Sequence, residues 1–140
     1  MPTAALGGRF GSIRLSTAST ATTAQTAIAE LTNYVLTVER DMIDVTSHDS
    51  SAWQENIAGT ARWSGTADVN YLSTGAGQAV ARTVLTTATP NIVNFTFKQS
   101  TSNTAKLWKG KGYVTAFDVN HDTNAAGLGT ISFQGTAALT

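Results

Sequence analysis

His48, Asp49 and Ser50 are adjacent in the chain, and side chains of these three types form the catalytic relay of many hydrolases. A Ser–His–Asp relay needs the imidazole between the hydroxyl and the carboxylate in space, and adjacent residues rarely reach that geometry. The other histidine, His121, is followed by Asp122, and the sequence contains no G-x-S-x-G elbow. These patterns indicate solvated loop residues, and we expect no enzyme activity.

A metal site is the second chemistry that these residues offer. It would require the loop with His48 and Asp49 to meet the loop with His121 and Asp122, and nothing in the spacing demands this. The chain has no H-x-x-x-H pair, no carboxylate-rich calcium loop, no cysteine and no phosphate-binding GxxxxGKS/T loop. The sequence therefore predicts no metal ligand and no cofactor.

A basic segment with an aromatic residue offers nucleic-acid binding as a third chemistry. Lys106, Lys109 and Lys111 surround Trp108, and such a pattern can bind nucleic acid. The alternative is a hairpin with a solvated lysine rim that protects a strand edge. Because the chain has nine bases, nine acids and no net charge, binding by phosphate neutralisation is not expected.

Charge is unevenly distributed along the chain. Five of the nine acids lie in the segment 38–55, and four of the nine bases lie in the segment 98–111. Opposite charges on separate segments can form a self-complementary surface that sets orientation during assembly. The two sets are Glu39, Asp41, Asp44, Asp49 and Glu55, and Lys98, Lys106, Lys109 and Lys111.

Alternating apolar and polar residues predict the β-strands that must position these groups. In ARWSGTADVNYL the apolar face carries Trp63, and a one-residue slip would place this side chain in water. RFGSIRLS, near the start, is a weaker candidate strand. The inward faces predicted are Ala61, Trp63, Ala67, Val69 and Tyr71; Tyr34, Leu36 and Val38; Val93, Phe95 and Phe97; Tyr113, Phe117 and Val119; and Ile131 and Phe133.

One segment, 75–87, has helical periodicity instead. Ala81, Val84, Leu85 and Ala88 form one stripe, Ser73 or Thr74 can cap it, and Pro90 ends it. With 140 residues, the chain is expected to form a single domain, 1–140. The predicted fold is mainly β, a β-sandwich or barrel of about six or seven strands with one flanking α-helix.

A low-complexity stretch, STASTATTAQTAIA at 16–29, has little to bury. It is either a flexible surface loop or an extended arm that orders against a neighbouring subunit. Both alternatives remain open from the sequence.

The run MIDVTSHDSSAWQENIAGTARWSGTADVNYL resembles the major tail tube proteins of long-tailed bacteriophages. The family pattern is a DVT-like strand end, an acid–Ser pair, a tryptophan, an acid two residues on, and a glycine before the next strand. Ala52 stands where relatives tend to have glycine, and Gln54 where a basic residue is common. The final run GYVTAFDVNHDTNAAGLGTISFQGTAALT resembles the family's last two strands. The matching positions of the first run are Asp44, Val45 and Thr46, then Asp49 and Ser50, Trp53, Glu55 and Gly59.

The resemblance implies a structural virion protein that assembles as six-fold rings stacked into a hollow tail tube. Inner strands of neighbouring subunits would join to line a channel for DNA, which passes without sequence-specific binding. The implied partners are other copies of the chain, a tape-measure protein inside, and tail terminator and baseplate or tip proteins at the ends, with no membrane. The implied location is the virion tail, assembled in the host cytoplasm.

On this interpretation, the segment 45–59 is an assembly loop in which Trp53 is an anchor buried against a neighbour. The predicted interface residues are Asp41, Asp44, Asp49, Trp53, Glu55, Lys106, Trp108, Lys109 and Lys111. Two alternatives remain: a tube subunit of a contractile injection or type VI-like secretion machine, and a monomeric β-sandwich that binds a carbohydrate or receptor. In the monomeric case, Trp53 or Trp108 would stack on a sugar ring.

Overall fold

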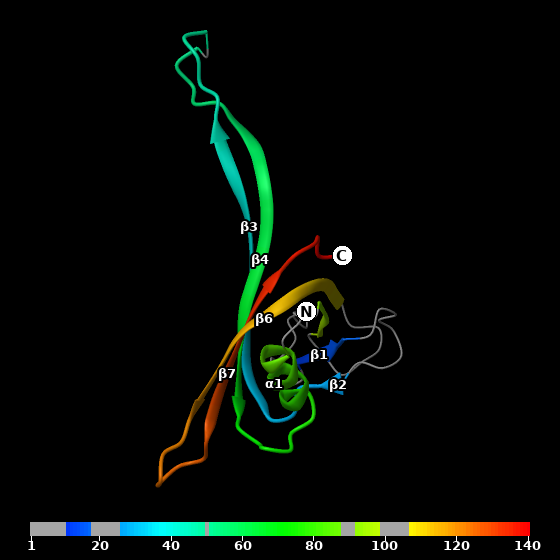
Figure 1. Cartoon of the computed structure of the whole chain (residues 1–140). Helices are drawn as coiled ribbons and strands as arrows, with labels where there is room; N and C mark the ends of the chain where they lie inside the picture. Colours follow the sequence, from blue (N-terminus) through cyan, green and yellow to red (C-terminus); the bar gives the residue numbers. More distant parts are fainter. Residues whose placement is uncertain (1–10, 18–25, 50, 88–91, 99–106) are drawn as a thin grey trace, which may run out of the picture.

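The computed structural model describes residues 11–17, 26–49, 51–87, 92–98 and 107–140 (Figure 1). These residues form seven strands and one helix, which confirms the expected mainly-β fold. The strands are β1 (Ser12–Ser16), β2 (Thr26–Ala27), β3 (Leu31–Asp44), β4 (Asn56–Asn70), β5 (Val93–Lys98), β6 (Leu107–Asn120) and β7 (Leu128–Gly135), and the helix is α1 (Gln78–Thr86).

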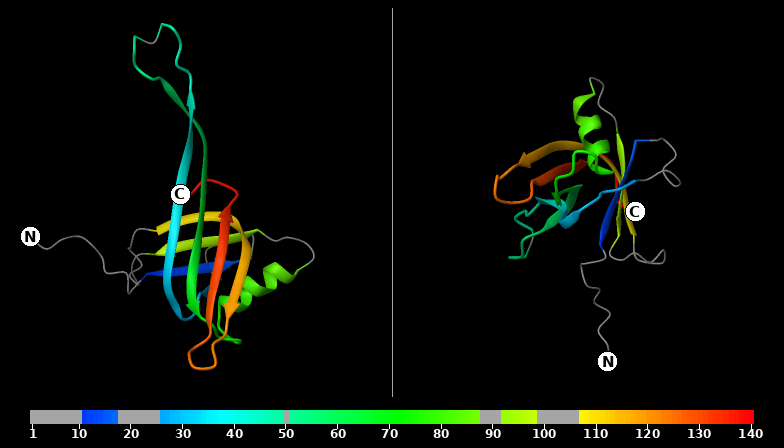
Figure 2. Two further views of the ribbon diagram at one scale, coloured as in Figure 1. Left: turned by 90° about the vertical axis from the view of Figure 1, so that its left-hand side faces the viewer. Right: turned by 90° about the horizontal axis from the view of Figure 1, so that it is seen from below.

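All seven strands belong to one antiparallel sheet in the order β2-β1-β5-β6-β7-β4-β3. The sheet folds back on itself at β6, which pairs with β5 over Leu107–Gly112 and with β7 over Gly112–Asn120. In Figure 2, β1, β5 and the first part of β6 run across β3, β4 and β7. A strand that passes from one layer to the other makes the corner of an orthogonal sandwich. One continuous sheet therefore supplies both layers.

An aromatic cluster joins the two layers. Trp63 on β4 meets Phe95 and Phe97 on β5 edge-on, with ring centroids 5.8 and 5.9 Å apart. Phe133 on β7 lies 5.1 Å from Phe95, and the Trp63 indole donates to the carbonyl oxygen of Ala137 at 2.6 Å. The faces predicted for β4, β5 and β7 are confirmed at the buried residues Trp63, Ala67, Val69, Val93, Phe95, Phe97, Ile131 and Phe133. The prediction is wrong at Ala61, which is exposed.

The predicted inward face of β6 is wrong at two positions. Tyr113 and Val119 are exposed, and Val114 is buried instead. At Tyr113 the cause is an irregularity in the pairing with β7 between Val114 and Ala116, because an extra residue in a strand reverses the alternation of side chains beyond it. Val119 lies on the same face as Phe117 but is exposed near the end of the strand, which stops at Asn120. Phe117 does pack against the core.

Two further strands depart from simple alternation. Every residue of β5 is buried, including Asn94, Thr96 and Lys98 on the face opposite Val93, Phe95 and Phe97. On β3, Tyr34 and Leu36 pack against the core, whereas Val38 is exposed because the strand leaves the body of the domain there.

The helix begins later than its pattern predicted and lacks the expected cap. Its N-cap is Gly77, with φ 75°, rather than Ser73 or Thr74, and an added Cβ there would lie 2.6 Å from the Ile28 backbone. Ala81 and Val84 are buried, while Leu85 is exposed; Ala88 and Pro90 lie outside the described residues. Within the described ranges, no helix has the length and apolar character that a membrane crossing requires.

The side chain of Gln78, at the start of α1, forms hydrogen bonds with three backbone groups. Its Nε2 donates to the carbonyl oxygens of Ala29 and Asn70 at 2.9 Å, and its Oε1 accepts from the Leu72 amide at 3.0 Å. The side chain is fully buried. It therefore ties α1 to the ends of β4 and of the segment before β3, and α1 also contacts β6 and β1.

Both ends of the low-complexity segment 16–29 belong to the sheet. Ser16 belongs to β1, and Thr26–Ala27 forms β2, which pairs with β1. Ile28 is buried, and its amide donates to the carbonyl oxygen of Ile13 at 2.9 Å. The sheet incorporates these residues, and 18–25 lie outside the described residues.

Candidate assembly interface

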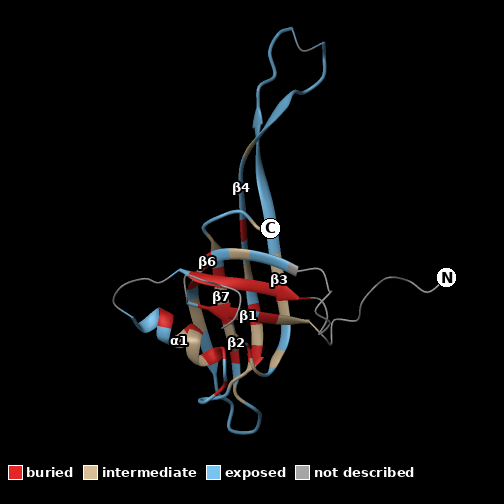
Figure 3. Ribbon diagram, turned by 90° about the vertical axis from the view of Figure 1, so that its right-hand side faces the viewer, coloured by how far each residue is buried: buried red, intermediate tan, exposed pale blue. Residues whose placement is uncertain are grey.

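The β3–β4 hairpin extends far beyond the body of the domain (Figure 1). The two strands pair from Leu31 and Val69 out to Asp44 and Asn56, while β7 accompanies β4 only between Ser64 and Asn70. Beyond Trp63 the hairpin therefore has no neighbouring strand among the described residues. Figure 3 shows it almost entirely exposed.

Hydrogen bonds close the base of the loop at the hairpin's tip. The Val45 amide donates to the carbonyl oxygen of Glu55 at 2.9 Å, and the Glu55 amide donates to Thr46 Oγ1 at 3.0 Å. Asp44 accepts from the Thr46 amide at 2.8 Å, from the Thr46 hydroxyl, and from Gln54 Nε2 at 3.3 Å. The bonds from Thr46, with a smaller effect of Gln54, lower the pKa of Asp44. Asp44 thus shapes the loop.

The tip presents Trp53 to solvent. Its side chain is 81% exposed, the highest value among the large exposed hydrophobic residues of the described chain. The residues before it, Ser51 and Ala52, have φ values of 41° and 65°, a left-handed conformation that glycine adopts most easily. Asp49 and Glu55 are also exposed at this end.

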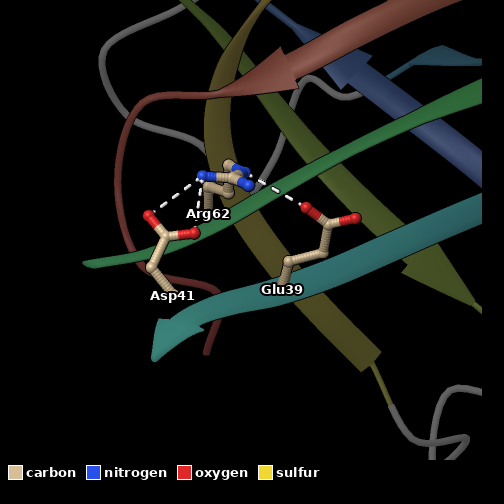
Figure 4. A network of polar contacts seen from close by, with 3 residues as sticks. All are labelled: Glu39, Asp41 and Arg62. Atoms are coloured by element: carbon tan, nitrogen blue, oxygen red, sulfur yellow. Dashed lines mark hydrogen bonds and ion pairs between the residues drawn. The ribbon is translucent and has the colours of Figure 1, made fainter. Parts of the chain in front are cut away.

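Halfway along the hairpin, Arg62 is held between two carboxylates (Figure 4). Its Nε lies 3.1 Å from Glu39 Oε2, and its Nη1 lies 3.0 Å from Asp41 Oδ1. Glu39 stands directly opposite Arg62 in the β3–β4 pairing. All three side chains are about half exposed. Asp41, predicted as an interface residue, therefore already has a partner within the chain, and Arg62 was not predicted to have a role.

The lysines and Trp108 lie on the other layer, in the first part of β6. Trp108 is 45% exposed, and Lys109 and Lys111 are exposed. Lys109 exchanges two backbone hydrogen bonds with Thr140, at 3.0 and 2.9 Å, so the C-terminal residues occupy this strand edge. The lysines therefore do not border an open edge there. Lys106 lies outside the described residues.

No ion pair joins the described residues of the acidic segment 38–55 to those of the basic segment 98–111. Among the described residues, the ion pairs are those that Arg62 makes with Glu39 and Asp41. A meeting of the two segments therefore requires a second copy of the chain.

The two histidine-containing loops that a shared metal site would require lie far apart. The loops that would have to meet are the tips of the β3–β4 and β6–β7 hairpins, which point to opposite ends of the molecule (Figure 1). His121 packs edge-on against Tyr71, with ring centroids 5.3 Å apart. No group of three or more potential metal ligands occurs within the described ranges.

A family model described as phage tail tube protein matches residues 12–140 of this chain. The chain belongs to the phage tail tube protein family. It is accordingly a structural component of the virion, and the resemblance that the hairpin and C-terminal motifs indicated is confirmed. No curated protein matches it by sequence.

Solved structures share the fold of this tail tube protein at low sequence identity. The tail of an empty gene transfer agent particle with C6 symmetry matches with a TM-score of 0.81 and 19% identity, over 97% of this chain and 98% of that one. The SPP1 tail tube matches with a TM-score of 0.75 and 12% identity, over 94% and 76%. The six-fold symmetrised baseplate of the anti-feeding prophage matches with a TM-score of 0.68 and 11% identity, over 100% and 96%.

Proposed function

We propose that this tail tube protein assembles into six-subunit rings that stack into a hollow tube, and that it has no catalytic turnover. The observation that carries the proposal is the projecting β3–β4 hairpin with Trp53 exposed at its tip. A large apolar side chain held in water at the end of a stiff extension is typical of an interface anchor. The likeness to a tail with C6 symmetry supports six-fold rings.

The lateral contact within a ring would use β3. This strand is the last of the sheet, and it pairs with β4 on one side only within the described residues. An open strand edge is a template for another chain, and closure into a ring removes it. A neighbouring subunit would therefore continue the sheet from β3.

The axial contact between rings would use the hairpin. It leaves the domain along the direction of its strands, whereas lateral neighbours join at strand edges. A subunit that reaches into the next ring makes a head-to-tail contact, which propagates as a filament. Trp53 would be buried in the neighbouring ring.

The acidic tip would meet the basic first part of β6 on a neighbouring copy. Asp41 and Asp44 already have intrachain partners, so Asp49 and Glu55 are the acids proposed to face Lys109 and Lys111. Each exposed pair contributes only about 0.2–1 kcal/mol. Their repetition around a ring would act mainly on orientation and rate.

Charge reversal tests this meeting of the two segments. The pair Lys109→Glu and Lys111→Glu should slow assembly, and adding Asp49→Lys and Glu55→Lys should partly restore the rate. Light scattering at constant protein concentration measures both effects. Normal assembly of the first variant, with no gain from the second pair, would show that these charges do not meet.

Removing the loop at the tip of the hairpin, with Trp53, tests the proposed axial role of the hairpin. Residues 46–54 are replaced by Asn-Gly, a two-residue sequence that closes a β-hairpin. The variant should fold and form rings that do not stack, as seen by electron microscopy and size-exclusion chromatography. Full-length tubes from this variant would refute the axial role, and loss of rings together with tubes would place the hairpin in the lateral contact.

The proposed partners beyond the chain itself are a tape-measure protein in the lumen, terminator and baseplate proteins at the ends, and DNA in transit. Assembly is proposed to occur in the host cytoplasm. A tube of a contractile injection machine is the second candidate function, favoured by the likeness to the anti-feeding prophage protein. The shared fold does not separate the two, and the family match favours the phage tail.

A further inference from the structure

The projecting part of β4 has an open edge. β7 pairs with β4 over Ser64–Asn70, and the chain after β7 then follows β6 into the other layer, where the Thr136 amide donates to the carbonyl oxygen of Lys111 at 2.9 Å. On the side that β7 leaves, residues 56–63 have no neighbouring strand in the part of the chain that the structure describes. An unpaired strand edge is a template for another strand.

The residues along this edge favour pairing. The first part of β4, Asn56–Ala61, contains neither proline nor a charged residue. Proline and lysine are two of the common means by which a free edge is kept from pairing. Ile57 and its cross-strand partner Ile43 are 52% and 51% exposed. The stem of the hairpin is therefore apolar as well as open on this side.

At the opposite end of the molecule, the β6–β7 hairpin projects in the other direction (Figure 1). Its end, residues 119–128, is here called the foot. Leu128 is 54% exposed and Val119 is 42% exposed. Asp122 orders the turn between them, because its Oδ1 accepts from the Asn124 amide at 3.0 Å. The foot is thus a two-stranded element with exposed apolar side chains.

The foot and the open side of the hairpin match in width. The four-strand layer β6–β7–β4–β3 ends in β3 on one side and in the second part of β6 on the other, because β5 pairs with β6 only over Leu107–Gly112. If a neighbour continues the sheet from β3, its β6 and β7 separate the two projecting hairpins. Strands lie about 4.8 Å apart, so the space between the hairpins has the width of one further two-stranded hairpin.

The lengths also match. From Trp63 to Asn56 the hairpin projects beyond β7 by roughly 24 Å, at about 3.4 Å per residue. By the same rise, β6 covers roughly 27 Å from Asn120 to Gly112. A foot seated at the base of the space therefore brings the hairpin tip level with Lys111 of the second copy. This is the level at which the acids of the tip are proposed to meet the lysines of β6.

We propose that the foot of one copy inserts between the hairpins of the next ring and pairs with the open edge of β4, so that successive rings interlock. The inference rests on the proposed function and names the surface that accepts the hairpin. In copies that face the same way, β7 of the foot runs antiparallel to β4, as it does within one chain. Main-chain hydrogen bonds along a strand edge give affinity, and they would act together with the anchor at Trp53.

Cross-linking of introduced cysteines tests the interlock, because the chain contains no cysteine of its own. Positions 57 and 128 lie near the starts of β4 and β7, at opposite ends of one subunit, so a link between them joins two copies. With a short bifunctional maleimide, Ile57→Cys/Leu128→Cys should give no product as dilute subunits and a ladder of covalent oligomers as tubes. Ile57→Cys/Leu85→Cys, with its second cysteine on α1, is the matched control and should give no ladder.

Two results with assembled tubes would overturn the inference. The first is the absence of a ladder from Ile57→Cys/Leu128→Cys. The second is a ladder from Trp53→Cys/Leu128→Cys but not from the first variant, which would show that the tip rather than the β4 edge meets the foot. Excess unmodified protein carries a variant that assembles poorly into mixed tubes, in which linked dimers are scored. If the unmodified protein forms no tubes, it is the proposed function that fails.

Discussion

Replacing Trp53 by alanine removes the proposed anchor of the axial contact. A tryptophan side chain can bury about 150–250 Å², and Trp53 is 81% exposed in the single chain. If a neighbour covers that area, burial at about 25 cal/mol per Å² is worth roughly 3–5 kcal/mol. Truncation of an interface anchor commonly costs ≥ ~2 kcal/mol. The concentration needed for assembly should therefore rise by at least about 30-fold.

The same substitution should leave the isolated subunit nearly unchanged. An exposed residue without special contacts alters folding stability by only about 0.5 kcal/mol on substitution. Trp53→Ala should thus unfold at the wild-type temperature in differential scanning calorimetry while assembling poorly in sedimentation assays. Trp53→Phe, which retains most of the apolar area, should assemble at intermediate concentrations. Wild-type assembly by Trp53→Ala would refute the anchor, as would a large fall in subunit stability.

Three further predictions concern the interior, the hairpin loop and the channel. Gln78→Leu removes the side-chain hydrogen-bond partner of two carbonyl oxygens and one amide, so chemical denaturation should show a loss of unfolding free energy of about 1–3 kcal/mol; an unchanged unfolding free energy would contradict this. Asp44 has a folded-state pKa below its ordinary value, so its stabilisation of the loop is present above the unfolded pKa and is lost as pH falls through the folded pKa. The protection of the loop amides against hydrogen exchange, relative to their intrinsic rates, should fall over that acidic range in the wild type, and in Asp44→Asn the loop should lack this dependence. In the double variant Glu39→Gln/Asp41→Asn, Arg62 loses its two carboxylate partners, and guanidinium groups also bind phosphate. Its tubes should therefore retain short duplex DNA at salt concentrations where wild-type tubes release it, and adding Arg62→Gln should abolish the retention; equal retention by all three would show that these acids do not keep Arg62 from phosphate.

The alternation of apolar and polar residues predicted the strands, because a strand that is buried on one side has an apolar residue at every second position. The prediction succeeded for β4, where Trp63, Ala67 and Val69 face the core. It failed on β6, because the irregularity near Val114 depends on how β6 fits against β7. That fit is a property of the folded sheet, and no local signal in the sequence marks it.

The candidate site was predictable only in part, because its geometry also depends on how the strands pair in the folded sheet. The motif around Trp53 identified the assembly loop, but the length of the projection depends on where β7 stops pairing with β4. The role of Arg62 required the β3–β4 register, which places Glu39 opposite it. The start of α1 was misjudged because Gln78 ties it to distant backbone groups, which a local cap signal does not report.

Electron microscopy of the purified chain over a range of concentrations tests assembly into six-fold tubes. We expect hollow tubes of uniform diameter whose end-on views have six-fold symmetry and whose formation depends on concentration. A uniform population of monomers at every concentration would contradict it and would favour the monomeric binding module instead.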